Sequence, residues 1–294
     1  MSGGLVHRFL FEGLDIRGAV VDLTECWQQM QAGRGYAAPV AELLGEMAAV
    51  TALIAAQLKQ AGRLTFQVRG QGPISLLVMD CDEQLRMRGM ARAIEGVTAA
   101  PAPELLGAHQ GGQLVLTLDL PTARQPYQSI VPMVGDSLAA IFEHYLEKSE
   151  QQASRLFLAA NDQRAVCLFL QKMPDADHKD ADGWHRVCQL ADTVKREELL
   201  GLDHEELLRR LFHEDITAGG LRVYEPHAVT YHCPDNRSKV ADTLLSLGRH
   251  EVEAILAEHG EIHVRDDICN RDYRFTREEV DALFAPTDTP GKLH

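Results

Sequence analysis

Apolar and polar residues alternate in short runs through the first 170 residues, which is the pattern of half-buried strands. Residues 7–12 and 16–23 are expected to form two such strands around a turn at Gly13. Further strands are predicted at residues 64–68, 74–78, 85–88, 114–118, 127–131, 155–159 and 165–170. Strands in antiparallel runs with segregated helices indicate an α+β domain over residues 1–174.

Two helices interrupt these strands. The first has Pro39 in its first turn, an apolar face of period 3.6, and an expected end at Gly62. The second is expected to begin after Asp136 as N-cap residue. The motif from Gly70 to Gly72 joins strand to strand and opens no helix, so it predicts a hairpin turn better than a phosphate-binding loop.

Residues 175–226 are predicted to be a helical linker. After a polar stretch, one helix presents Trp184, and a second opens with the capping box Asp203-x-x-Glu206. The second helix has an apolar face that contains Leu207, Leu211 and Phe212. These faces need a partner surface, which we expect on the first domain.

Residues 227–285 are predicted to form a small C-terminal domain. It is expected to contain brief helices at 238–247 and 249–258 and a last helix capped by Thr276-x-x-Glu279. The tail, residues 286–294, is expected to be disordered.

Composition narrows the class of protein. The 294 residues are 45% hydrophobic and carry a net charge of -14, which argues against a nucleic acid or an anionic membrane as the main partner. No run approaches the roughly 20 apolar residues of a membrane span. The N-terminus lacks the pattern of a secretion signal. The six cysteines are scattered, so the cytosol is expected.

Candidate chemistry is concentrated near the C-terminus. The first domain offers no nucleophile, acid pair or metal set at a recognisable spacing, and we predict that the chain is not an enzyme. Two turn-like clusters, His232-Cys233-Pro234-Asp235 and Asp266-Asp267-Ile268-Cys269-Asn270, resemble two zinc knuckles with one cysteine each. A module of this size usually needs a metal or a cross-link.

Several motifs in order along the chain resemble the redox-regulated 33 kDa chaperonin family. They are His7-Arg8-Phe9-Leu10-Phe11-Glu12, Ile16-Arg17-Gly18, Gln71-Gly72-Pro73, Arg88-Gly89-Met90-Ala91-Arg92, Gly135-Asp136-Ser137-Leu138-Ala139 and Glu253-Ala254-Ile255-Leu256-Ala257-Glu258-x-Gly260-Glu261-Ile262. The resemblance implies an ATP-independent holdase for heat and oxidative stress, whose partners are unfolded client proteins and which dimerises when oxidised. It implies a client-binding surface on the first domain and the linker, at Trp184, Leu207, Leu211 and Phe212.

In that family four thiolates bind one zinc, and oxidation to two disulfides unfolds the metal domain and the linker. The four ligand positions correspond here to Cys233, Asp235, Asp266 and Cys269, so neither local disulfide forms. Three interpretations stay open. Zinc is held by these four residues, with His232 or His263 in place of one aspartate. Alternatively, Cys233 and Cys269 pair directly on oxidation and stabilise the domain by roughly 3–4 kcal/mol. In the third, the site is vestigial.

Two other functions are compatible with these residues. A zinc-dependent hydrolase would need an open metal site with a base such as Asp267. A structural adaptor would form stable complexes with one folded partner.

Overall fold

The computed structural model describes residues 3–218 and 220–285. The chain divides into two compact units, Met1–His232 and Cys233–His294, which are described separately below. The predicted division at residues 174 and 226 stays a prediction, although residues 227–232 belong to the first of these two units.

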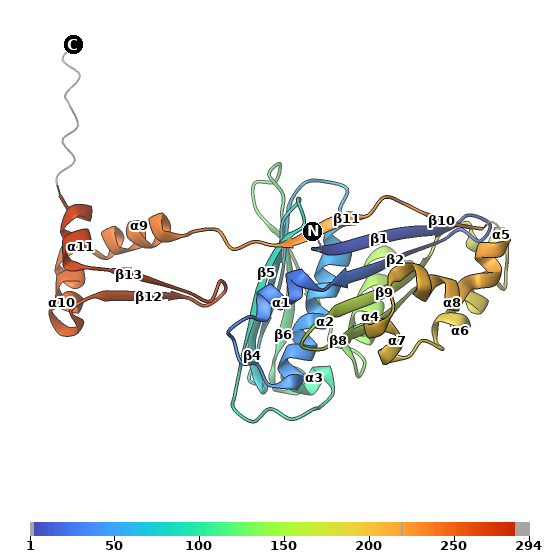
Figure 1. Ribbon diagram of the computed structural model, residues 1–294, viewed down its shortest axis with the longest axis horizontal. Helices are drawn as coiled ribbons and strands as arrows, with labels where there is room; N and C mark the ends of the chain where they lie inside the picture. The colour runs from blue at the N-terminus through green and yellow to red at the C-terminus, as the bar shows by residue number, and fades with distance from the viewer. Residues whose placement is uncertain (1–2, 219, 286–294) are drawn as a thin grey trace, which may run out of the picture. The chain divides into compact units, whose positions relative to one another are not determined.

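The first unit is built on one large sheet, drawn in Figure 1. Its strands are β1 (Gly4–Phe11), β2 (Ile16–Leu23), β3 (Arg63–Arg69), β4 (Ile74–Cys81), β5 (Arg86–Ala93), β6 (Gln113–Asp119), β7 (Tyr127–Val131), β8 (Ser154–Ala160), β9 (Ala165–Lys172), β10 (Leu221–Val223) and β11 (His227–Tyr231). Their order is β7-β6-β3-β4-β5-β11-β1-β2-β9-β8, and β10 pairs with β1. The antiparallel α+β class predicted from the sequence is confirmed.

Strand β11 joins the two halves of this sheet. It pairs antiparallel with β1, where Val6 lies opposite His227, and parallel with β5, where Met87 lies opposite Tyr231. The segment predicted to open the C-terminal domain therefore completes the sheet of the first unit. The hairpin turn predicted around Gly70 is confirmed, because residues 70–73 connect β3 to β4.

Helix α2 (Ala38–Ala55) forms the centre of the main core and packs against strands of both halves of the sheet. It is long and apolar enough to cross a membrane by length and composition, but 67% of it is buried inside the unit, as in the core helix of a soluble protein. The predicted end at Gly62 is wrong, because the helix ends at Ala55. Gly62 instead allows a close approach to Leu120: a Cβ there would lie 2.6 Å from that side chain.

The remaining helices on this core are α1 (Glu25–Gln31), α3 (Ala102–Leu105), the 3₁₀ turn η1 (Ala108–Gln110) and α4 (Leu138–Glu150). The N-cap of α4 is Ser137, whose hydroxyl accepts a hydrogen bond from the Ala140 amide at 3.2 Å, and not Asp136 as predicted. The sequence pattern did not reveal α1, which is only seven residues long.

The predicted linker contains four short helices, α5 (Ala176–Lys179), α6 (Gly183–Ala191), α7 (Arg196–Gly201) and α8 (His204–Thr217). Of these, α6, α7 and α8 share a second hydrophobic cluster with the face of the β1–β2–β9–β8 half-sheet opposite α2 (Figure 1). The expected partner surface on the first domain is therefore present. Asp203 caps α8, since its carboxylate accepts a hydrogen bond from the Glu206 amide at 2.8 Å. The other half of the predicted capping box is replaced, because the Glu206 carboxylate accepts from Arg209 and Arg210.

The second unit consists of α9 (Arg237–Leu247), α10 (Arg249–His259), β12 (Ile262–Asp266), β13 (Arg271–Phe275) and α11 (Arg277–Leu283). The three helices match the predicted ones, and the capping box of Thr276 and Glu279 is present. The β12–β13 hairpin was not predicted. The small core of the second unit contains residues such as Val252, Leu256 and Tyr273. The tail predicted as disordered, residues 286–294, lies outside the described residues.

Candidate functional site

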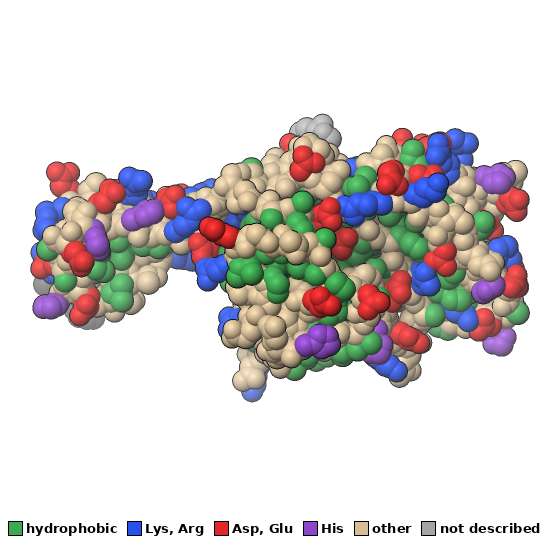
Figure 2. Space-filling view, turned by 90° about the horizontal axis from the view of Figure 1, so that it is seen from below, with side chains coloured by type: hydrophobic (Ala, Val, Ile, Leu, Met, Phe, Trp, Pro, Cys, Tyr) green, Lys and Arg blue, Asp and Glu red, His purple; other side chains and the backbone are tan. Residues whose placement is uncertain are grey.

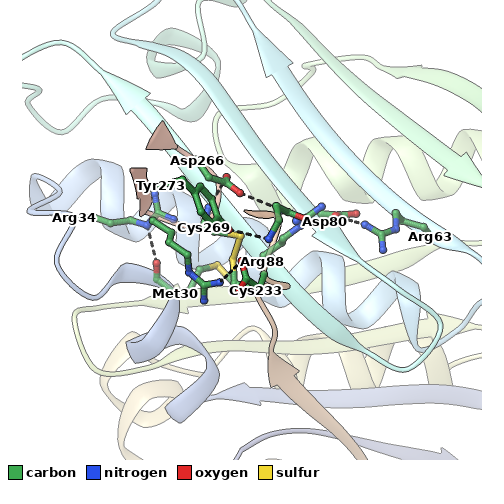
Figure 3. The surroundings of a disulfide bond; sticks show 12 residues. Met30, Arg34, Arg63, Asp80, Arg88, Cys233, Asp266, Cys269 and Tyr273 are labelled. Carbon is green, nitrogen blue, oxygen red and sulfur yellow. Dashed lines mark hydrogen bonds and ion pairs between the residues drawn. A yellow bond between two sulfur atoms is a disulfide. The ribbon is translucent and has the colours of Figure 1, made fainter. Parts of the chain in front are cut away.

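Cys233 and Cys269 are joined by a disulfide within the second unit (Figure 3). Cys233 begins this unit, and Cys269 lies in the turn between β12 and β13. The two Cα atoms are 5.6 Å apart across a sequence separation of 36 residues. Cys269 is buried, at 7% exposure. The bond therefore ties the start of the unit to its hairpin.

The two aspartates that stand at ligand positions of the family accept hydrogen bonds from the backbone. Asp235 accepts from the Arg237 amide at 3.0 Å at the start of α9. Asp266 accepts from the Cys269 amide at 3.1 Å and so closes the hairpin turn. In both places a carboxylate stabilises the loop that carries, or lies next to, a cysteine.

Asn236 adds two further links between the start of the unit and the hairpin. Its amide donates to the Tyr273 hydroxyl at 2.9 Å, and its side chain donates to Asp266 at 3.1 Å. Figure 3 shows Asp266 and Tyr273 beside the disulfide. The disulfide thus reinforces a contact that hydrogen bonds already make.

A zinc ion does not fit the four predicted ligands while the disulfide between Cys233 and Cys269 is closed. The sulfurs of Cys233 and Cys269 are bonded to each other, and both carboxylates accept the hydrogen bonds given above. Within residues 3–218 and 220–285, no three His, Cys, Asp or Glu side chains are grouped so as to hold a metal. Of the predicted substitutes, His232 is exposed and His263 lies 2.9 Å from Asp272. The zinc site stays a prediction.

The other four cysteines are unpaired, and burial weakens their acidity. Cys26, Cys81 and Cys167 are buried, and Cys188 is half-buried. Burial raises the pKa of Cys26 to about 12 and that of Cys188 to about 11, and it also raises the pKa values of Cys81 and Cys167. Because the thiolate is the reactive form, these residues serve as small apolar side chains.

Three of the four predicted client-binding side chains are buried between α8 and the sheet. Leu207, Leu211 and Phe212 are 2%, 8% and 0% exposed. The Phe212 ring packs edge-on against Phe11, with centroids 5.1 Å apart. The backbone at Phe212 leaves helical geometry, with φ -128° and ψ 31°. Trp184, on α6, packs at the border of the same cluster.

Polar contacts that the sequence did not reveal also join these helices to the rest of the first unit. Arg196 of α7 lies 3.0 Å from the Glu42 carboxylate. Arg164 donates to the Leu200 carbonyl at 2.9 Å. The rings of His7 and His204 are stacked with centroids 3.4 Å apart. Such pairs join residues distant in the chain, so no local pattern marks them.

Comparisons with known proteins agree over nearly the whole chain. The family described as "Hsp33 protein" matches residues 4–276. The 33 kDa chaperonin of Chromobacterium violaceum is 40% identical over 280 residues, 95% of this chain and 93% of that protein. The 33 kDa chaperonin of Methylobacillus flagellatus is 38% identical and is covered to 94%.

A solved structure shows the same fold. The crystal structure of the 33 kDa chaperonin from Thermotoga maritima matches with a TM-score of 0.77 at 23% identity, over 96% of this chain and 98% of that one. Family, relatives and fold agree with the resemblance found in the sequence motifs. The chain belongs to the Hsp33 family of chaperones.

Proposed function

We propose that the chain is an ATP-independent holdase that binds unfolding proteins in the cytosol and prevents their aggregation under stress. The observation that supports this best is the sheet face covered by the linker helices. Its buried side chains are Phe9, Phe11, Ile16, Val20, Ala159, Val166, Leu168 and Leu170. Release of α6, α7 and α8 exposes this face together with the apolar sides of the helices themselves, and a large exposed apolar surface binds unfolded chains.

We further propose that the redox response differs from that of a four-cysteine relative. A single disulfide that closes a loop of this length stabilises the folded second unit by roughly 3–4 kcal/mol. Oxidation then strengthens the unit, whereas in the four-thiolate switch oxidation unfolds it. Heat is accordingly the trigger for releasing the linker helices, and oxidation raises the temperature at which release occurs. Released apolar surfaces also favour a homodimer of the activated form.

Light scattering of a heat-unfolding client enzyme tests both proposals without ATP. The wild-type chain is expected to suppress aggregation on heating at about equimolar ratio, and peroxide treatment is expected to raise the onset temperature of suppression by several degrees. Cys233→Ser should abolish that shift, while the matched control Cys188→Ser, at an unpaired cysteine, should keep it.

Two results would contradict these proposals separately. Absence of suppression with and without peroxide refutes the holdase. Suppression switched on by peroxide without heating refutes the stabilising disulfide but leaves the holdase intact. An adaptor protein would instead form a stable complex with one folded partner. Zinc content near one per reduced chain would show that the predicted metal set forms once the disulfide is broken.

A further inference from the structure

The first unit contains an open cavity of about 600 Å³ at the C-terminal end of α2. There the helix stops at Ala55 while β1, β2 and β9 run on beneath it, so part of the sheet face is left uncovered. The apolar lining includes Ala19, Leu58, Phe169 and Met173. A cavity of this size and lining accommodates a small ligand with an apolar body.

The charged residues around this cavity are mainly basic, although the protein as a whole is acidic. Arg8, Arg17 and Lys59 line it, and Asp15 is the one carboxylate among the lining residues. Asp15 is already engaged, since it accepts a hydrogen bond from the Asp175 amide and lies 3.7 Å from Lys179. With a net charge of -14 on the chain, three cations at one cavity are a local reversal of sign.

The charge of Arg17 is balanced within the protein better than the charge of Arg8. Arg17 donates to Gln171 at 2.6 Å and lies 3.6 Å from the Glu150 carboxylate. Among the described residues, the Arg8 guanidinium contacts His227 at 2.9 Å and lies 6.0 Å from the centroid of the Tyr224 ring. Burial and the charge of Arg8 lower the pKa of His227, so this histidine is a neutral partner.

The Nε atom of Arg8 is buried and has no hydrogen-bond partner within the described residues. The Arg8 guanidinium lines the cavity and has a neutral histidine as partner, so an anion in the cavity would supply the counter-charge. We propose that the cavity binds an amphiphilic carboxylate, with its anionic group at Arg8 and Lys59 and its apolar body against Phe169 and Leu58. This site is independent of the holdase activity proposed above.

Isothermal titration calorimetry of the full chain with sodium decanoate tests the site. We expect saturable binding of one decanoate per chain. The matched probe decyltrimethylammonium has the same tail and the opposite charge, and the neutral probe decanol has no charge. Both should bind at least tenfold more weakly than decanoate. The basic residues of the cavity repel decyltrimethylammonium and form no ion pair with decanol.

Three variants locate the binding. Arg8→Met keeps the aliphatic stem and should weaken decanoate binding roughly ten- to hundredfold. Lys59→Glu changes an exposed residue and should weaken it roughly two- to fivefold. Ala56→Trp, which adds bulk at the lining, should abolish it. The control Arg63→Met removes an arginine that pairs with Asp80 away from the cavity, and it should leave binding unchanged.

The proposal is overturned by any of three results. These are no decanoate binding, several decanoates per chain with equal affinity for all three probes, or binding that survives both Lys59→Glu and Ala56→Trp. Because Lys59 is exposed, the first of these two variants keeps the test valid even if Arg8→Met fails to fold.

Discussion

The two faces of the β1–β2–β9–β8 half-sheet are covered in different ways. On one face lies α2, with 12 of its 18 residues buried and no lysine or arginine in its sequence. On the other lie the linker helices, of which the longest, α8, buries four of 14 residues. A helix that is apolar nearly all round exposes apolar surface to water whenever it leaves the core, whereas an amphipathic helix keeps a polar face that water can solvate. We therefore expect the first face to stay covered and the second to be covered reversibly.

The surface of the molecule agrees with this distinction. Figure 2 shows acidic and basic side chains interspersed on the face in view. Charged pairs within the linker segment include Arg210–Glu198 and Arg186–Asp180. Pairs of this kind, exposed to water, contribute little to stability. The apolar contacts between the linker helices and the sheet therefore supply most of the free energy that holds these helices on the second face.

Replacing one phenylalanine in each of the two hydrophobic clusters, the one around α2 and the one under the linker helices, should produce the largest effects. Phe212 packs on Phe11 and Phe142 packs on Phe66, each pair at 5.1 Å and 88°, and both Phe212 and Phe142 are fully buried. Either change to alanine should cost about 3–5 kcal/mol. Phe212→Ala should release α8 alone and give aggregation suppression without heating, while Phe142→Ala should lower the unfolding midpoint of the whole unit.

Hydrogen exchange over residues 204–217, together with light scattering, distinguishes these outcomes. Loss of protection confined to α8 in Phe212→Ala supports reversible covering. If both variants lose protection uniformly, the two faces are equivalent and the comparison fails.

Loss of the disulfide should have the next largest effect. The second unit has a small core, and we expect Cys233→Ser to destabilise the oxidised unit by roughly 3–4 kcal/mol. Limited proteolysis within residues 237–283 of oxidised protein measures this, with reduced wild type as the reference. Cys188→Ser, in the first unit, is the control. Equal proteolysis rates for oxidised and reduced wild type would argue against a stabilising bond.

Helix α2, which covers the first face, contains an acidic group whose contribution to stability depends on pH. Burial raises the pKa of Glu46 on α2 to about 7, opposed by Arg196 and assisted by Glu42. A raised folded-state pKa means that stability is full below the ordinary value of 4.5 and is lost as pH rises through about 7. Glu46→Gln should therefore stabilise the first unit at pH 8 by on the order of 2–3 kcal/mol and far less at pH 5.

Urea unfolding at the two pH values checks this. A difference between variant and wild type that does not change with pH would show that Glu46 stays ionised in the fold.

The smallest expected effect is a loosening of α8 from the sheet at acidic pH. Burial lowers the pKa of His7, as does His204 stacked on it from α8, while Asp22 of β2 and Glu205 of α8 act in the opposite direction. A depressed folded-state pKa means that stability is present above pH 6.5 and is lost as pH falls through the folded value. Hydrogen exchange of α8 should accelerate below pH 6.5 more in wild type than in His204→Gln. The same acceleration in both would remove the histidine pair as the cause.

Prediction from the sequence succeeded where the determinants are local. Alternation predicted strands β1 to β9 of the sheet, and the periodic apolar residues predicted α2, α4, α6 and α8. Prediction from the sequence failed where a contact between distant residues determines the local structure. The end of α2 depends on the turn geometry after Ala55, and β11 is a strand because β1 and β5 lie on either side of it. Short α1 and α7 need the sheet to hold them, since helices of six or seven residues are unstable alone.

The candidate site shows the same division. From the two knuckles alone, Cys233, Asp235, Asp266 and Cys269 were open to a metal, a disulfide or no role at all. The hairpin brings Cys269 within bonding distance of Cys233, and backbone amides engage the two carboxylates. The cavity beside Arg8 had no signal in the sequence, because its three cations come from separate segments.

The order of residues by itself determined the family, the α+β class and the amphipathic linker, because these follow from motifs and periodicities that are read within one segment. Tertiary structure alone decided which cysteine meets which partner, which face of the sheet the linker covers, and where a cation lacks a counter-charge. Each of these depends on distances between residues far apart in the chain, and such distances exist only after folding.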